Sequence, residues 1–282
     1  MKKILNLAAL LLLPLAALSQ KAEIVRPVLS SYTLEAGTAH LAETYLSPLR
    51  HSGTALALSY ERMQAMRFDP ERWVMRLSGR LSAARTLNQP ARNAYLWDVD
   101  LHVGWSMLRR IRPAENWAIF AGGSTAVEGG AFYLPRNSNN PVSAKAAWTI
   151  SIAAGAAWNH TFGRLPVCLR YLAEMPVTGI FFSPQYGELY YEIYLGNHKG
   201  LVRGAWPGNF FRLNNLLTAD FRLGSTIIRA GYRCGITSTK ASHIVTRRIE
   251  HTAVIGIASE WISLSADRRG PSEKSKIISA LY

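Results

Sequence analysis

The sequence predicts an all-β protein, an antiparallel transmembrane β-barrel of the outer-membrane type with about ten strands. Three features of the 282-residue chain support this fold. The chain begins with an apolar leader, apolar residues then recur at every second position, and the connections between the periodic segments alternate between short and long. Apolar residues make up 49% of the chain and charged residues 18%, which excludes a disordered polymer.

Residues 1–19 have the pattern of a cleavable signal peptide. A cationic start precedes an apolar run from Ile4 to Leu18, and small residues stand just before Gln20. The run is shorter than the roughly 20 apolar residues that a membrane-spanning helix needs. We therefore expect export through the inner membrane and a mature protein that begins at Gln20.

The domain organisation follows from where the periodicity stops. A single β-barrel domain is expected over residues 20–265, and a flexible tail over 266–282. The formal net charge is +14, but the bases are scattered singly instead of forming a stripe with aromatic residues. This pattern argues against nucleic acid as a partner and favours an anionic membrane surface, here outer-membrane lipid and lipopolysaccharide.

The clearest strand pattern lies between residues 95 and 107. One face carries only large apolar side chains, namely Tyr95, Trp97, Val99, Leu101, Val103, Trp105 and Met107. The other face carries Leu96, Asp98, Asp100, His102, Gly104 and Ser106. The same period of two predicts ten strands, over residues 30–42, 54–63, 73–82, 95–107, 117–127, 144–158, 164–174, 215–223, 226–238 and 250–262.

The connections predict which end of the barrel faces which compartment. The second, fourth, sixth and eighth are tight, whereas the other five are longer, notably 128–143 and 175–214. In an antiparallel barrel this places every tight turn and both termini at one end, as in outer-membrane proteins with short periplasmic turns. Residues 188–195 also alternate, so an extra hairpin there would raise the strand count to twelve.

A soluble β-sandwich would show a similar alternation, and two observations favour the barrel over it. First, Trp148 and Trp158 share a face ten residues apart, which for a strand tilted by about 40° is roughly 25 Å along the barrel axis and matches the height of a lipid-facing band. Second, the polar faces hold equal numbers of acids and bases, which suits an enclosed lumen. These residues are Glu35, Glu61, Asp98, Asp100, Glu174, Asp220 and Glu260, with Arg76, Arg80, Lys145, Arg170, Arg222, Arg229 and Arg233.

The most enzyme-like cluster in the sequence is Asp98, Asp100 and His102. These side chains share the inward face of one expected strand, and acids beside a histidine can activate water for hydrolysis. The alternative is that the acids form lumen ion pairs with Arg76, Arg80 or Arg170. The sequence contains no nucleotide-binding loop, zinc-protease motif or nucleophile elbow, and no cofactor or metal is predicted. Cys168 and Cys234 are expected on opposite faces and therefore as two free thiols.

The segment 175–214 is rich in aromatic residues, which is unusual for a solvated loop. Aromatic side chains can form a ligand-binding surface or can pack as a lid over the barrel mouth. The candidate ligand-binding residues are Phe181, Phe182, Tyr186, Tyr190, Tyr191, Tyr194 and Trp206.

Several longer strings resemble one protein family. They are SYERMQAM (59–66), QPARNA (89–94), NNPVSAKAAW (139–148), FGRLPV (162–167) and YGELYYEIYLGN (186–197). From about Ser31 to Ser265 the chain resembles an uncharacterised family of exported proteins from Gram-negative gut bacteria, a domain of unknown function. The resemblance implies export and a barrel-like fold, and it supplies no catalytic residues.

The sequence therefore predicts an outer-membrane barrel that is structural or binds an extracellular ligand through its external loops. Insertion of such a barrel implies the barrel-assembly machinery as a partner. Two other functions stay open: a barrel-embedded hydrolase that uses Asp98, Asp100 and His102, and a narrow transporter.

Overall fold

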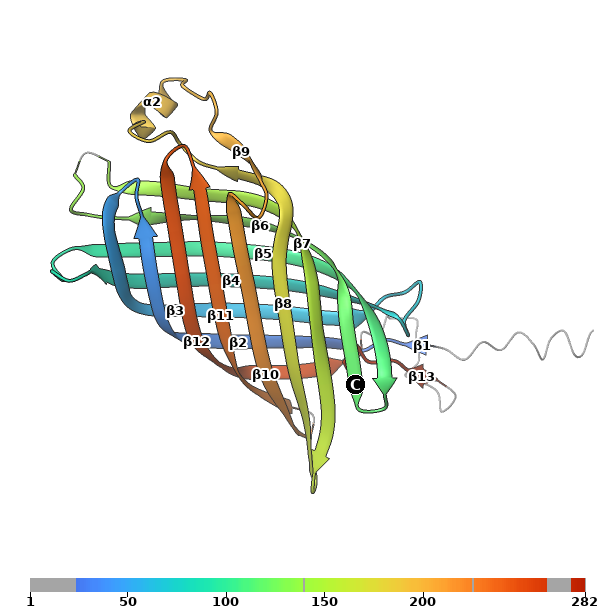
Figure 1. The fold of residues 1–282 in the computed structure, drawn as a ribbon. Coiled ribbons are helices and arrows are strands. Elements are labelled where there is room, and N and C mark those ends of the chain that lie inside the picture. Colours follow the sequence, from blue (N-terminus) through green and yellow to red (C-terminus); the bar gives the residue numbers. More distant parts are fainter. Residues whose placement is uncertain (1–23, 139, 225, 263–274, 282) are drawn as a thin grey trace, which may run out of the picture.

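The computed structural model describes residues 24–138, 140–224, 226–262 and 275–281, which form a closed antiparallel β-barrel (Figure 1). Each of the ten wall strands pairs with its neighbours in chain order, and β12 pairs with β2 to close the wall. The wall consists of β2 (Val28–Glu43), β3 (Ser47–Ala65), β4 (Trp73–Asn88), β5 (Tyr95–Ala114), β6 (Trp117–Tyr133), β7 (Val142–Phe162), β8 (Leu165–Phe182), β10 (Phe210–Leu223), β11 (Thr226–Ala241) and β12 (Ile244–Trp261). The expected signal peptide lies outside the described residues.

All ten expected strands are present, and most of them extend farther toward the loop end than the pattern indicated. The first and ninth connections were expected to be long, and this was wrong. They are tight turns at 44–46 and 242–243, because β3 and β12 continue past the apolar band into polar segments without alternation. Within the described residues, no helix is long and apolar enough to cross a bilayer.

The expected extra hairpin does not form. Residues Tyr190–Tyr194 instead make one helical turn, α2, and β9 (Val202–Ala205) pairs only with the end of β8. Local hydrogen bonding accounts for the helix, because the Glu192 carboxylate accepts the Leu189 backbone N–H at 3.0 Å and so caps its first turn. The wall therefore has ten strands and not twelve.

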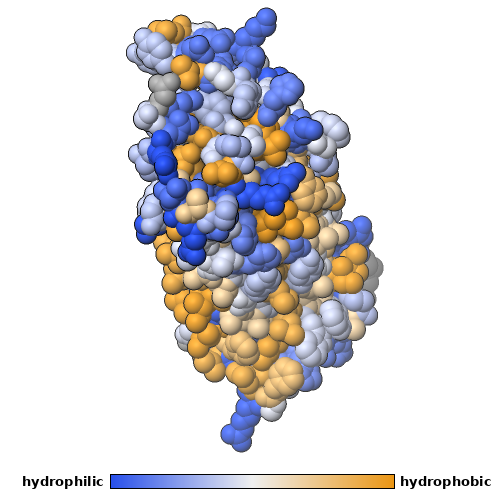
Figure 2. Space-filling model, turned by 60° about the vertical axis from the view of Figure 1, so that its left-hand side comes forward, coloured by the Kyte–Doolittle hydropathy of each residue, from blue (hydrophilic) through white to orange (hydrophobic). Residues whose placement is uncertain are grey.

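The outer surface of the wall is an apolar band with cationic rims. In the described strands, no charged side chain faces outward between Arg62 and Arg109 at the tight-turn end and Arg50, Arg85, Lys240 and Arg247 at the loop end. Figure 2 shows apolar residues gathered over the strands below the hydrophilic loop end. The few polar groups on the band pair with one another, as where the Tyr171 hydroxyl donates to Asn215 at 2.7 Å.

The barrel interior has three layers. An apolar cluster that includes Leu41, Leu96 and Phe132 lies toward the loop end. A layer of ion pairs fills the middle, and a second apolar cluster lies toward the tight turns. Cys168 faces this lower cluster and Cys234 faces outward, so the prediction of two free thiols is confirmed.

The end of the chain differs from the flexible tail that the sequence predicts. A short strand, β13 (Lys276–Ile277), pairs in parallel with β1 (Ile24–Val25) beside the tight turns (Figure 1). The residues that follow enter the barrel, where Ala280 and Leu281 are 0% and 1% exposed. Apolar burial orders this segment, a contribution that the two-residue period of the wall does not reveal.

Candidate functional site

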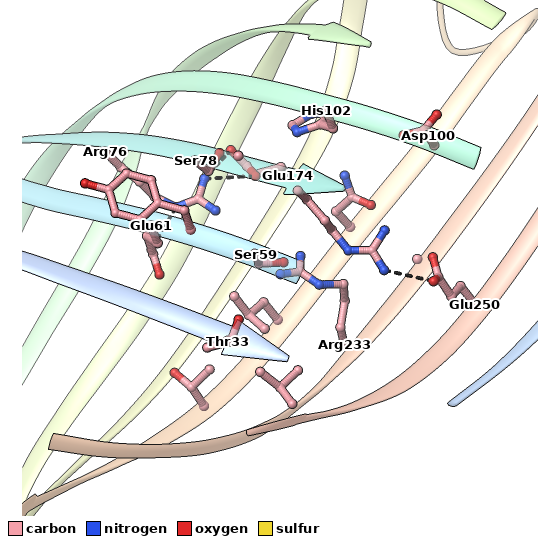
Figure 3. Close-up of a pocket in the computed structure, with 18 of the residues that line it drawn as sticks. Thr33, Ser59, Glu61, Arg76, Ser78, Asp100, His102, Glu174, Arg233 and Glu250 are labelled. Atoms are coloured by element: carbon pink, nitrogen blue, oxygen red, sulfur yellow. Dashed lines mark hydrogen bonds and ion pairs between the residues drawn. The ribbon is translucent and has the colours of Figure 1, made fainter. Parts of the chain in front are cut away.

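The lumen is filled by a network of ion pairs from opposite sides of the wall (Figure 3). Glu61 on β3 is its most connected member. Its carboxylate lies 2.9 Å from Arg76, 2.5 Å from Arg170 and 3.0 Å from Arg229. Arg76 also contacts Glu174 at 3.1 Å, so one network joins four strands. The alternation of β3 and β8 explains this placement, because Glu61 and Arg170 both occupy inward positions.

A second centre of the network is Glu35 on β2, whose side chain is fully buried. It pairs with Arg80 and Arg233, each at 3.0 Å, and accepts a hydrogen bond from Ser59 at 2.6 Å. Arg80 reaches across to Glu250 at 2.8 Å. Every acid here has a cationic partner, which offsets the cost of burying charge.

The network contains equal numbers of acids and bases, as the sequence predicts for an enclosed lumen. Its acids are Glu35, Glu61, Asp98, Asp100, Glu128, Glu174, Asp220 and Glu250, and its bases are Arg76, Arg80, Lys145, Arg170, Arg212, Arg229, Arg233 and Arg248. The sequence prediction missed Glu128, Arg212, Arg248 and Glu250. It also included Arg222 and Glu260, which pair at 3.1 Å near the rim. Extending the expected strands toward the loop end would have found Glu128, Arg212 and Arg248, whereas Glu250 already lies at the first position of the expected strand 250–262.

The structure places Asp98 and Asp100 in this network. Lys145 Nζ lies 2.5 Å from Asp98 and 3.2 Å from Asp100, and Arg248 Nε lies 3.3 Å from Asp98. The expected ion-pair partners Arg76, Arg80 and Arg170 were therefore wrong, because the stagger of the barrel brings β7 and β12 to this point instead. Both carboxylates are therefore engaged in ion pairs with cations of the lumen. His102 faces the lumen beside Glu174.

Little free space remains in the lumen. The cavity among the central ion pairs measures about 80 Å³, which is room for a few water molecules. A second cavity of about 70 Å³ lies nearer the loop end, between Phe181, Phe210 and Arg212. Among the described residues, no group of three or more His, Cys, Asp or Glu side chains is arranged to hold a metal ion.

Residues 183–201 form a cap at the loop end, and it is fastened by hydrogen bonds to the barrel. The Tyr45 hydroxyl donates to the Glu188 carbonyl at 2.6 Å, and the Tyr190 hydroxyl accepts the Ala144 backbone N–H at 2.6 Å. Burial raises the pKa of Tyr190 to about 12. The Glu188 carboxylate accepts a hydrogen bond from the Asn197 side-chain amide at 2.7 Å, which links the two ends of the cap.

The candidate aromatic residues fall into two groups. Phe181 is buried against Phe210, with ring centroids 5.2 Å apart, and the Phe182 ring lies 6.3 Å from the ring of the docked Tyr190. Of these side chains, Tyr190 belongs to the cap and docks it on the barrel, whereas Phe181 and Phe182 belong to β8. The outward-facing members are Tyr186, Tyr191, Tyr194 and Trp206, which are 65%, 66%, 84% and 60% exposed. We call these four residues the aromatic surface.

Hydrogen bonds fix the backbone at Trp206, whose ring is exposed. Its backbone N–H donates to the Asn209 side chain at 2.9 Å, and its carbonyl accepts the Phe210 N–H at 2.8 Å. The indole lies so close over Gly208 that any side chain there would collide with the ring. A fixed, exposed aromatic ring is the type of side chain that anchors ligands at low entropic cost.

Two solved structures and one protein family are similar to this chain. The outer membrane protease OmpT from Escherichia coli matches 83% of this chain with 97% of its own length, at 7% identity and a TM-score of 0.42. The transport unit of the autotransporter AIDA-I from Escherichia coli matches 87% of this chain with 92% of its own length, at 7% identity and a TM-score of 0.38. No curated protein matches the sequence.

One family model, described as a protein of unknown function (DUF3316), matches residues 4–268. The match covers the barrel wall from its first strand to its last. The chain therefore belongs to the DUF3316 family.

Proposed function

We propose that this protein is an integral barrel of the outer membrane, closed to solutes, which binds an extracellular ligand through the aromatic surface on the cap and on the adjacent turn that carries Trp206. The observation that carries the location is the outer wall. It combines an apolar band free of outward charges with borders at which the outward-facing charged residues of the described strands are all bases. Such rims complement the phosphates of phospholipid and lipopolysaccharide.

Aromatic side chains at both borders of the band support the same location. At the tight-turn end Trp117 and Trp158 pair across two strands, with ring centroids 6.4 Å apart. At the loop end the Arg85 guanidinium lies 4.0 Å from the Tyr95 ring centroid and 5.3 Å from that of Trp97. Paired aromatic belts of this kind mark the two water–lipid interfaces of transmembrane barrels.

The filled lumen favours binding over transport or catalysis. Its charges are neutralised in pairs, and its central cavity holds only a few water molecules. The ligand would instead meet Tyr194 and Trp206, which lie outside the wall and are exposed. Flat aromatic rings on a fixed cap suit the apolar faces of sugar rings, so oligosaccharides are the class of ligand that we propose.

Cell fractionation tests the location. Expressed with its leader, the full chain should sediment with outer membranes, require detergent for extraction and migrate differently on a gel before and after boiling. Folded protein that remains in the supernatant without detergent would contradict the proposal.

A carbohydrate array tests the binding. Detergent-purified protein should bind selected oligosaccharides, and Trp206→Ala and Tyr194→Ala should each weaken the signal at least about tenfold. Phe68→Ala is the matched control, because Phe68 is 64% exposed but lies in a tight turn at the opposite end. Equal binding by all three variants, or no binding by the wild type, would reject the aromatic surface as a sugar site.

A further inference from the structure

The tight-turn mouth of the barrel contains an apolar cup, and the end of the chain occupies it. Ala280 and Leu281 belong to the same buried cluster as Leu108, Phe120 and Leu172 of the wall. The order of exposure along the segment is specific. Ile277 is 59% exposed, whereas the next residue, Ile278, is only 5% exposed. Every residue from Ile278 to Leu281 is buried, so the segment is enclosed by the barrel from position 278 onward.

A buried arginine binds the backbone of this segment. Arg110 on β5 is 3% exposed, and its Nη1 donates to the carbonyls of Ser279 and Ala280. Its Nη2 and Nε donate to the carbonyls of Pro70 and Glu71 in the β3–β4 turn, at 2.9 to 3.1 Å. Without the chain end, Nη1 would lose the Ser279 and Ala280 carbonyls as acceptors, which is costly for a buried charged donor.

Further contacts fix the segment at both sides. The Ile278 N–H donates to the Val25 carbonyl at 2.9 Å, and Asn159 Nδ2 donates to the Leu281 carbonyl at 3.1 Å. The Lys276–Glu71 ion pair at 2.5 Å is exposed and adds little. Apolar burial and the bonds from Arg110 and Asn159 to backbone carbonyls therefore hold the segment in the mouth of the barrel.

We infer that the tight-turn mouth is a peptide-binding site whose ligand is the chain's own C-terminal segment, residues 278–281. The bound segment seals the lower lumen against the aqueous compartment at that end. This site is independent of the proposed cap ligand, because the layer of ion pairs separates the two ends of the barrel.

Cys168 is a natural reporter for the seal. Its side chain is 1% exposed and belongs to the same buried cluster, and its register partner on β7 is Asn159, which binds Leu281. In a Cys234→Ser background it is the only cysteine of the chain. Its reaction rate with a small water-soluble maleimide, measured on folded protein in detergent, then reports access of water to the cup.

Ile277 and Ile278 provide a matched pair of substitutions. Ile278→Asp would place a carboxylate at a buried position of the bound segment, should release the segment and should speed Cys168 labelling at least about tenfold. Ile277→Asp changes the exposed neighbour and should leave the rate unchanged. Equal rates in the two variants, or rapid labelling of the Cys234→Ser parent, would overturn the inference.

A peptide added in trans separates ligand binding from general loosening of the barrel. A synthetic peptide of residues 275–282 should restore slow labelling to the Ile278→Asp protein, whereas the same peptide with aspartate at position 278 should not. Failure of the first peptide to protect Cys168 would show that the cup does not bind the segment as a ligand. If Ile278→Asp does not fold, as judged by gel mobility before boiling, Leu281→Asn replaces it with the same expected outcomes.

Discussion

The role of Glu61 shows how single residues hold the lumen together. Its carboxylate pairs with three arginines, and Arg170 has no second acid among its ion pairs in the described structure. Arg76 and Arg229, in contrast, retain Glu174 and Asp220 as partners. Removing the charge of Glu61 therefore leaves one buried guanidinium without an acidic partner.

We predict that Glu61→Gln lowers the free energy of unfolding by about 3–5 kcal/mol, the usual cost of breaking a buried pair. Urea unfolding of the protein from lipid vesicles, followed by tryptophan fluorescence, measures this change. Glu260→Gln is the control, since its partner Arg222 is 37% exposed at the side chain, and it should cost less than about 1 kcal/mol. Similar losses in both variants would show that the buried network is not the main source of stability.

Tyr190 makes docking of the cap sensitive to alkaline pH. Its pKa is raised from 10.0 to about 12 when the cap is docked. Because the pKa of Tyr190 is raised in the docked state, the stability that its neutral hydroxyl adds to docking is fully present below pH 10. This stability is lost as the pH rises toward 12. Tyrosinate absorbance of the wild type minus that of Tyr190→Phe should therefore show one group titrating near pH 12. A difference titration centred near pH 10 would contradict the docked position of this hydroxyl.

The sequence predicted which residues face the lumen but not which of them meet. Alternation assigns Asp98 and Lys145 to inward faces, yet their contact depends on how the wall curves and staggers around the axis. The same limit applies to Arg110, whose inward position follows from the pattern. Its acceptors are backbone carbonyls of a turn and of the chain end, which no side-chain pattern reveals.

At the scale of strands, β5 provides a direct test of the apolar band. Leu101 and Ile111 lie on the same outward face and are 50% and 51% exposed, but Leu101 lies mid-strand and Ile111 lies beside the cationic rim. If the band contacts lipid, Leu101→Arg should cost about 2–4 kcal/mol and Ile111→Arg about 0–1 kcal/mol, because the cost of a charge depends on its depth.

Unfolding from lipid vesicles gives both values, and the difference between the two variants is the informative quantity. A soluble barrel would expose both sites to water, where arginine is tolerated equally. Equal stability of the two variants would therefore reject the lipid-facing assignment while leaving the fold intact.

The strands themselves were largely predictable, since each lipid-facing segment must alternate to satisfy two environments. The pattern fails where that requirement ends. Beyond the band the outer faces of β3 and β12 are polar, so the strands continue with no alternating signal and the turns at 44–46 and 242–243 are missed. In α2 a short run of alternation is overridden by a local side-chain cap.

At the scale of the whole molecule, the lumen is closed at three levels. The cap covers the loop end, the ion pairs fill the centre, and the C-terminal segment fills the tight-turn end. We predict that the protein produces no conductance steps in a planar bilayer. The Ile278→Asp variant should also be silent, because it opens only the lowest level. Steady channel activity of the wild type would instead favour the narrow transporter.

The global shape followed from the sequence, whereas the aromatic surface followed only in part. Aromatic density singled out 175–214, but density does not distinguish Phe181, which packs against the barrel, from Tyr194, which faces solvent. That distinction depends on the anchors at Tyr45 and Ala144, which are distant in sequence from the cap.

The parallel pairing of β1 with β13 has a consequence for biogenesis. The buried cluster that holds Leu281 includes Leu29 of β2 and Ala258 of β12, so it is complete only after these first and last wall strands have joined. Burial of Leu281 therefore marks a barrel that has closed, and a molecule stalled before closure would leave residues 278–281 accessible to quality-control proteases.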